Sequence, residues 1–207
     1  MLTLLTVLVV NATADERLLT DEVSAGLGVF GSGYSQPGLR LGDANLSPTV
    51  TGRVLFSGVT LEGGVLLVAP LTRDGSALAV TGSARVGWTG QRFTVLAGVL
   101  GQWGQGANPA WQCLPTVRAS VDFGPFGLTL GVFDLLGLVP AHLSFDVSLT
   151  RVRFSVGWVA PIGLVGTLDL PVAERFAVRL QAFAYKLAQA EFAQGTVGVV
   201  FAPGGLR

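Results

Sequence analysis

Apolar and polar side chains alternate along most of this chain with a period of two residues. From residue 116 to 123 the even-numbered positions carry Thr, Arg, Ser and Asp, whereas the odd-numbered positions carry Val, Ala, Val and Phe. Residues 142–150 repeat the arrangement, with His, Ser, Asp, Ser and Thr separated by Leu, Phe, Val and Leu. Because successive side chains of a β-strand point to opposite faces, the pattern predicts strands with one apolar and one polar face.

The alternation and the turn residues between its segments predict twelve strands, at about 21–32, 48–57, 59–69, 77–89, 92–103, 114–124, 127–135, 141–149, 152–160, 163–170, 175–187 and 195–203. The connections alternate in length, from the long segment Gly33 to Ser47 to the tight turn Ser57-Gly58. An even number of such strands with every second connection short is typical of bacterial outer-membrane proteins. We therefore predict an all-β, closed antiparallel transmembrane β-barrel with short periplasmic turns and longer outer loops.

Short turns also predict how neighbouring strands pair, and a one-residue slip would exchange the faces. A two-residue turn at Thr150-Arg151 pairs apolar residues only, namely Leu149 with Val152, Val147 with Phe154, Phe145 with Val156 and Leu143 with Trp158. The turn at Gly90-Gln91 predicts the pairs Trp88 with Phe93 and Val86 with Val95. The turn at Ser57-Gly58 predicts Phe56 with Val59 and Val54 with Leu61, which places Arg53 opposite Glu62 as an ion pair. Independent hairpins thus place the apolar faces of neighbouring strands, here called the dry face, on the same side of the sheet.

The composition favours a lipid environment for that face. Half of the residues are hydrophobic, only 13% are charged, and the formal net charge is zero. Disorder requires low hydrophobicity and high charge, and nucleic-acid binding requires a basic balance, so both are excluded. A sheet in hydrocarbon must close on itself, because an edge N–H or C=O finds no partner there. The alternative is a soluble β-barrel or sandwich in the periplasm, against which the sparse charge argues.

Aromatic residues fall near both ends of the predicted strands. On the turn side they are Trp88, Phe93, Phe123, Phe126, Phe176 and Phe201, and on the loop side Tyr34, Trp103, Trp111, Trp158 and Tyr185. This distribution is typical of the two aromatic girdles of a membrane barrel.

The first fourteen residues predict a signal peptide, so that residues 15–207 form the barrel. An apolar run from Leu2 to Val10 is followed by Ala12-Thr13-Ala14, which fits an A-x-A cleavage site. A basic n-region is missing, and the alternative to a signal peptide is a buried apolar N-terminus.

Export together with the barrel fold predicts localisation in the outer membrane of a Gram-negative bacterium, with outer-membrane lipid and the barrel-assembly machinery as partners. The oligomeric state is not determined.

With the dry face toward lipid, the polar face lines a lumen. The predicted lumen-lining charges are of both signs: Arg53, Glu62, Arg85, Arg118, Asp122, Asp146, Arg153, Asp169 and Arg179. A lining of one sign would indicate a selective channel. A mixed lining indicates either ion pairs that close the interior or a narrow, porin-like pore with a transverse field.

One arrangement carries candidate chemistry. His142 and Ser144 lie two residues apart on one strand face, where a histidine can act as the base of a serine, and Asp146 follows on the same face. The His-x-Ser spacing and the strand number resemble the outer-membrane phospholipase A family, in which such a pair, oriented by an asparagine, hydrolyses lipid acyl esters. No asparagine follows Asn108 here. In that family the pair faces lipid, whereas the predicted register turns His142 and Ser144 inward.

The counts of cysteine and histidine limit the possible metal-dependent functions. One cysteine, Cys113, and one histidine leave no cysteine-based or multi-histidine metal centre, so no metal and no cofactor is predicted. The main hypothesis is a non-enzymatic outer-membrane barrel, either a narrow or plugged pore or a structural protein of the envelope. The alternatives are a lipid acyl hydrolase using His142 and Ser144, and a barrel that binds a small apolar ligand.

Overall fold

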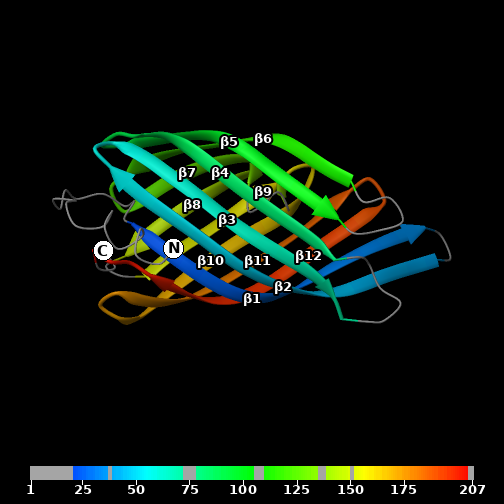
Figure 1. The fold of residues 1–207 in the computed structure, drawn as a ribbon. Coiled ribbons are helices and arrows are strands. Elements are labelled where there is room, and N and C mark those ends of the chain that lie inside the picture. Colours follow the sequence, from blue (N-terminus) through cyan, green and yellow to red (C-terminus); the bar gives the residue numbers. More distant parts are fainter. Residues whose placement is uncertain are drawn as a thin grey trace.

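The computed structural model describes residues 21–36, 39–71, 78–104, 110–134, 139–149 and 152–204. They form one closed barrel in which each strand pairs with its neighbours in sequence and β1 pairs with β12. The strands are strongly tilted, and the start of β1 lies beside the end of β12 at one end of the barrel (Figure 1). The predicted signal peptide lies outside the described residues.

All twelve predicted strands are present and antiparallel. They are β1 (Glu22–Gln36), β2 (Leu39–Phe56), β3 (Val59–Pro70), β4 (Ala79–Thr89), β5 (Phe93–Gly104), β6 (Ala110–Phe123), β7 (Phe126–Asp134), β8 (Val139–Leu149), β9 (Val152–Val159), β10 (Ile162–Ala173), β11 (Phe176–Leu187) and β12 (Ala190–Phe201). The end that holds the start of β1 is the turn side, and the opposite end is the loop side. The closed barrel confirms the predicted fold class.

Two of the three predicted hairpin registers are confirmed. Every apolar pair predicted between β8 and β9 is present, from Leu149 with Val152 to Leu143 with Trp158. Between β2 and β3, Phe56 pairs with Val59 and Arg53 with Glu62. Ser57 and Gly58 both have positive φ, at 49° and 82°. Two left-handed residues are what a type I′ turn requires, and the twist of this turn matches that of the flanking strands.

The predicted pairing at the β4–β5 hairpin is wrong by two residues. Trp88 pairs with Val95 and Val86 pairs with Ala97. The turn lies one residue further along the chain, at Gln91-Arg92, where the N–H of Gly90 donates to the carbonyl of Phe93 at 2.7 Å. A shift of two residues leaves every side chain on its predicted face, since the side-chain period is also two.

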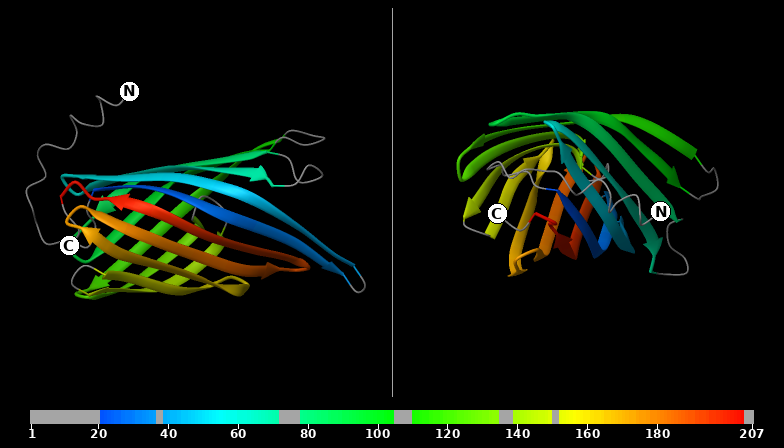
Figure 2. Two further views of the ribbon diagram at one scale, coloured as in Figure 1. Left: turned by 90° about the horizontal axis from the view of Figure 1, so that it is seen from below. Right: turned by 60° about the vertical axis from the view of Figure 1, so that its left-hand side comes forward.

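The predicted long connection from Gly33 to Ser47 is also wrong. This segment belongs to the β1–β2 hairpin, whose ladder continues to the pair Gln36 with Leu39. The hairpin extends beyond its neighbours on the loop side (Figure 2, left). A ladder outside the lipid needs no lipid-facing apolar row, so its strands carry a weaker alternation. The loop side also has two-residue connections at 160–161 and 188–189, so not every outer connection is longer.

The outward faces of the strands form an apolar surface. Each of the twelve strands carries exposed large apolar side chains. Examples are Val50, Leu61, Val86, Val99, Val121, Leu130, Phe145, Phe154, Leu164, Leu180 and Val197. Exposed aromatic residues mark the turn side, where Trp88 and Phe93 pack edge to face at 4.8 Å. Such a surface is stable only in contact with lipid. Within the described residues, no helix is long and apolar enough to cross a membrane.

Candidate functional site in the barrel lumen

The nine charged residues assigned to the lumen from the sequence line one cavity of about 290 Å³ inside the barrel. The cavity extends from the middle of the barrel to the turn-side ends of β6 to β9, where Pro125, Phe126 and Ser148 border it. The structure adds Glu22 and Asp134 to the charges around it. The barrel alternation therefore gathers charges from strands distant in sequence around one central space.

Four of these charges alternate in sign along one row of neighbouring strands. Glu22 on β1 pairs in register with Arg53 on β2, Arg53 with Glu62 on β3, and Glu62 with Arg85 on β4. The guanidinium of Arg53 donates to Glu62 Oε2 through both Nε, at 2.9 Å, and Nη2, at 2.5 Å. Arg85 Nη2 donates to Glu62 Oε1 at 2.5 Å. The carboxylate of Glu62 is thus held between two arginines, and the ion pair expected with Arg53 is present.

A second row lies on β9 to β11. Arg153, Asp169 and Arg179 are consecutive register partners. Arg179 donates to both carboxylate oxygens of Asp169, from Nε at 2.7 Å and from Nη2 at 2.8 Å. This two-point geometry is the strongest arrangement between an arginine and a carboxylate.

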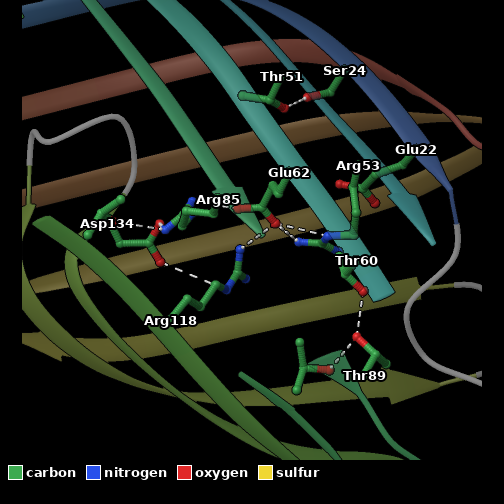
Figure 3. A network of polar contacts seen from close by, with 12 residues as sticks. Glu22, Ser24, Thr51, Arg53, Thr60, Glu62, Arg85, Thr89, Arg118 and Asp134 are labelled. Atoms are coloured by element: carbon green, nitrogen blue, oxygen red, sulfur yellow. Dashed lines mark hydrogen bonds and ion pairs between the residues drawn. The ribbon is translucent and has the colours of Figure 1, made fainter. Parts of the chain in front are cut away.

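Further contacts cross the lumen and join strands that are not neighbours. Arg85 donates from Nη1 to Asp134 Oδ1 at 2.5 Å, and Arg118 on β6 lies 3.4 Å from Glu62 Oε2 (Figure 3). On the other side, Glu22 accepts from Arg179 at 3.2 Å and from Arg153 at 3.4 Å. We call the nine residues Glu22, Arg53, Glu62, Arg85, Arg118, Asp134, Arg153, Asp169 and Arg179 the charged layer. It joins strands that are two to four positions apart around the ring.

Asp134 was missed by the sequence reasoning because the local backbone breaks the alternation. Counted from Gly131, which faces the lumen, strict alternation turns Asp134 toward lipid. Phe133 has a positive φ of 47°, which is uncommon for a residue with a bulky side chain. After this residue the face changes, and Asp134 points inward with a side chain only 1% exposed. The signal in the sequence that could have identified Asp134 was its isolated negative charge at the end of an apolar strand.

Glu22 was missed for a different reason. It is the first residue of β1 and lies at the end of the predicted strand, where the alternation does not determine which face a side chain takes. Its register partner Arg53 was assigned to the lumen, so the pairing of β1 with β2 places Glu22 there as well. That pairing was hidden by the incorrect long connection.

The loop-side half of the lumen carries buried apolar side chains together with buried polar ones such as Ser47, Thr81 and Gln194. Inward-facing apolar side chains above the charged layer are buried, and we call them the apolar layer: Leu66, Leu100, Val139, Val159, Val165 and Phe183. Four of these six residues are 0% exposed, whereas a side chain that faces a water-filled bore would keep accessible surface. Tyr185 packs against this layer and stands in register with lumenal Gly163. Its predicted place in the lipid-facing girdle is therefore wrong, while the side chains of Tyr34 and Trp111 lie outside the described set.

Asp122 and Asp146 form a separate acidic pair nearer the turn side. Both are register partners of Gly127 on β7, so they flank the same glycine on the lumenal face. Asp146 accepts a hydrogen bond from Thr129 at 2.6 Å. Among the described residues, no arginine or lysine contacts either carboxylate within ion-pair distance. The two acids therefore give this end of the cavity a negative character.

His142 and Ser144 both lie inside the lumen and are buried. The nearest charged group to the imidazole is Asp134, with Nε2 of His142 3.9 Å from Oδ2, rather than Asp146. Nδ1 of His142 has no hydrogen-bond partner within the described structure. In the same part of the chain, no group of three or more His, Cys, Asp or Glu residues is arranged to hold a metal ion.

A closed antiparallel barrel with an apolar outer surface and a charged lumen is the architecture of a bacterial outer-membrane β-barrel protein, and this chain belongs to that class. The chain is similar in fold to outer membrane phospholipase A from Escherichia coli, with 9% identity, a TM-score of 0.50, and 86% of this chain and 92% of that chain covered. At this identity the likeness concerns the barrel fold alone.

Two other solved structures are similar over most of the chain. The translocator domain of the autotransporter NalP from Neisseria meningitidis has 13% identity and a TM-score of 0.47, with 96% of this chain and 92% of that chain covered. Neisserial surface protein A has 11% identity and a TM-score of 0.37, with 88% and 96% covered. No protein-family model and no curated protein matches the sequence.

Proposed function

We propose that this protein is a non-enzymatic outer-membrane barrel whose lumen is plugged, and that it serves the envelope as a structural element rather than as an open pore. The observation that carries the proposal is the pair of layers that fill the lumen in series. Salt bridges join non-neighbouring strands on the lumenal face, between Arg85 and Asp134 and between Glu22 and Arg179. Fully buried Leu66 and Leu100 lie above them.

The charged layer supports a plug because most of its charges are paired with one another. Arg85, Glu62 and Asp134 have side chains 6%, 9% and 1% exposed, so little of their charge faces water. A conducting pore keeps its charges hydrated and available to passing ions. Buried ion pairs with additional hydrogen bonds instead hold one arrangement of the wall.

Planar bilayer recordings test the plug. We expect the wild-type protein to insert without stepwise conductance, whereas stepwise conductance from the folded wild type contradicts the proposal. Opening one layer alone, by Arg85→Ser with Arg118→Ser or by Leu100→Ser with Phe183→Ser, leaves the membrane silent. Opening both layers produces conductance. A heat-modifiability gel, in which folded barrels migrate anomalously until boiled, checks that each variant is folded.

The lumenal position of His142 and Ser144 argues against a lipid acyl hydrolase. An acyl ester in the membrane would have to pass the barrel wall to reach these buried side chains. Incubation with labelled phospholipid and lipopolysaccharide tests this alternative. We expect no turnover by the wild type, and turnover that disappears in Ser144→Ala would establish the hydrolase instead.

A further inference from the structure

The five arginines of the charged layer are not equally satisfied. Arg53, Arg85 and Arg179 each make an ion pair of 2.7 Å or shorter. The contacts of Arg118 and Arg153 with carboxylates are 3.4 Å or longer within the described structure. Their side chains are 29% and 18% exposed, and both line the central cavity. These two guanidinium groups therefore keep donor capacity that faces open space.

Within the charged layer, five arginines face the four carboxylates of Glu22, Glu62, Asp134 and Asp169, whereas the whole cavity, with Asp122 and Asp146, holds six carboxylates against five arginines. The unsatisfied donors, rather than the net charge of the cavity, favour an anion. In addition, Nη2 of Arg153 is buried without a hydrogen-bond partner among the described residues. A buried guanidinium donor without an acceptor is costly, and an anion with several oxygens satisfies such donors well.

The cavity is accessible from one end. It reaches the turn-side ends of β6 to β9, whereas the apolar layer stands between it and the loop side. Short turns face the periplasm in barrels of this class. A solute would therefore enter from the periplasmic side and would find a closed end.

We propose that this cavity is a periplasm-facing vestibule that binds a small oxyanion, a phosphate or a carboxylate, on Arg118 and Arg153. Three arginines with short ion pairs hold the wall, and the two with spare donors hold the ligand. The acidic pair Asp122 and Asp146 lies on the path to the site and opposes the entry of an anion. Its two charges weaken binding without contacting the ligand.

Binding of radiolabelled inorganic phosphate to the folded full-length barrel in a neutral detergent, by equilibrium dialysis at constant ionic strength, tests the proposal. We expect saturable binding by the wild type and a loss of at least tenfold in affinity in the double variant Arg118→Gln, Arg153→Gln. Lys186→Gln is the matched control, because it removes one exposed cation at the loop-side rim. It should change the affinity by less than twofold. Absence of saturable binding, or equal binding by the double variant, overturns the proposal.

Two further variants separate ligand contact from a general effect on the fold. Arg118→Lys keeps the positive charge and should retain more affinity than Arg118→Gln. Asp122→Asn removes a negative charge from the path and should tighten phosphate binding, so weaker binding by this variant contradicts the assigned geometry. The heat-modifiability gel is run on every variant, and only folded protein is compared. A barrel without conductance can still bind phosphate, so the proposal of a plugged lumen and the proposal of an anion-binding vestibule can be contradicted independently.

Discussion

The two layers of the lumen close the same barrel by opposite physical means. In the charged layer, arginines and carboxylates from β1 to β4, β6, β7 and β9 to β11 are joined by directed hydrogen bonds. In the apolar layer, Leu66, Leu100 and Phe183 are buried by packing, beside the hydrogen bond from Gln194 to Ser47. Both layers stand on inward positions of the barrel, and β3, β9, β10 and β11 contribute to both. Alternation therefore decides which positions face inward, but it does not decide whether the interior is polar.

The contrast teaches where each layer is vulnerable. An ion-pair network depends on the balance of its partners, so the loss of one leaves a buried charge without compensation. A packed apolar layer depends on volume, so the loss of a side chain leaves a cavity. Variants that separate these two dependencies are ordered below from the largest expected effect to the smallest.

Glu62→Gln should have the largest effect, because Glu62 accepts from Arg53 and Arg85 and lies near Arg118. Breaking a buried ion pair by removing one partner costs about 3–5 kcal/mol. Equilibrium unfolding in urea, in lipid vesicles, measures the loss. The double variant Arg53→Gln, Glu62→Gln should recover part of it, and a double variant less stable than the single one would contradict the balance argument.

Leu100→Ala breaks the other layer. Its side chain is 0% exposed, and a buried leucine shortened to alanine costs about 2–5 kcal/mol. The same unfolding experiment measures the change, with Leu100→Met as the matched control that conserves volume and should cost less than about 1.5 kcal/mol. If the two variants are equally destabilised, the layer is held by something other than packing.

Asp134→Asn sharpens the role of the contacts across the lumen. The substitution keeps the shape of the side chain but removes the negative charge that Arg85 contacts at 2.5 Å. Hydrogen bonds to charged groups contribute about 1.5–3 kcal/mol, so a loss in that range is expected in unfolding. A loss below about 0.5 kcal/mol would show that the contacts between neighbouring strands suffice.

Lys186→Gln should have the smallest effect. Lys186 pairs with Glu191 at 3.2 Å, but both side chains are about half exposed at the loop-side rim. Exposed pairs contribute about 0–1 kcal/mol, and water screens this one. A change in unfolding free energy larger than about 1 kcal/mol would contradict the view that the important ion pairs lie in the lumen.

Most of the fold could be predicted from the sequence, because period-two alternation repeats in nearly every strand. The β8–β9 register followed from it together with the two-residue turn, since a slip by one residue would have set apolar residues against polar ones. The β4–β5 register did not, because shifts by two residues preserve the faces and only turn geometry distinguishes them. The β1–β2 extension was missed because its outer part lacks a lipid-facing row.

The candidate site was predicted in part for similar reasons. Arg53 opposite Glu62 followed from a two-residue turn, whereas the contact of Arg85 with Asp134 joins residues 49 positions apart. No local pattern reports which strands face each other across a closed ring. The inward turn of Asp134 also depends on the left-handed backbone of Phe133, a conformation that a phenylalanine rarely adopts.

The amino-acid sequence by itself determined that the chain forms twelve strands, which of their faces meets lipid, and that the interior carries charges of both signs. Those properties depend on alternation and composition, which are local. Only the tertiary structure decided that the charges neutralise one another across the lumen, that an apolar layer lies above them, and that Arg118 and Arg153 keep spare donors. These features depend on the stagger and closure of the ring, which set residues far apart in sequence at contact distance.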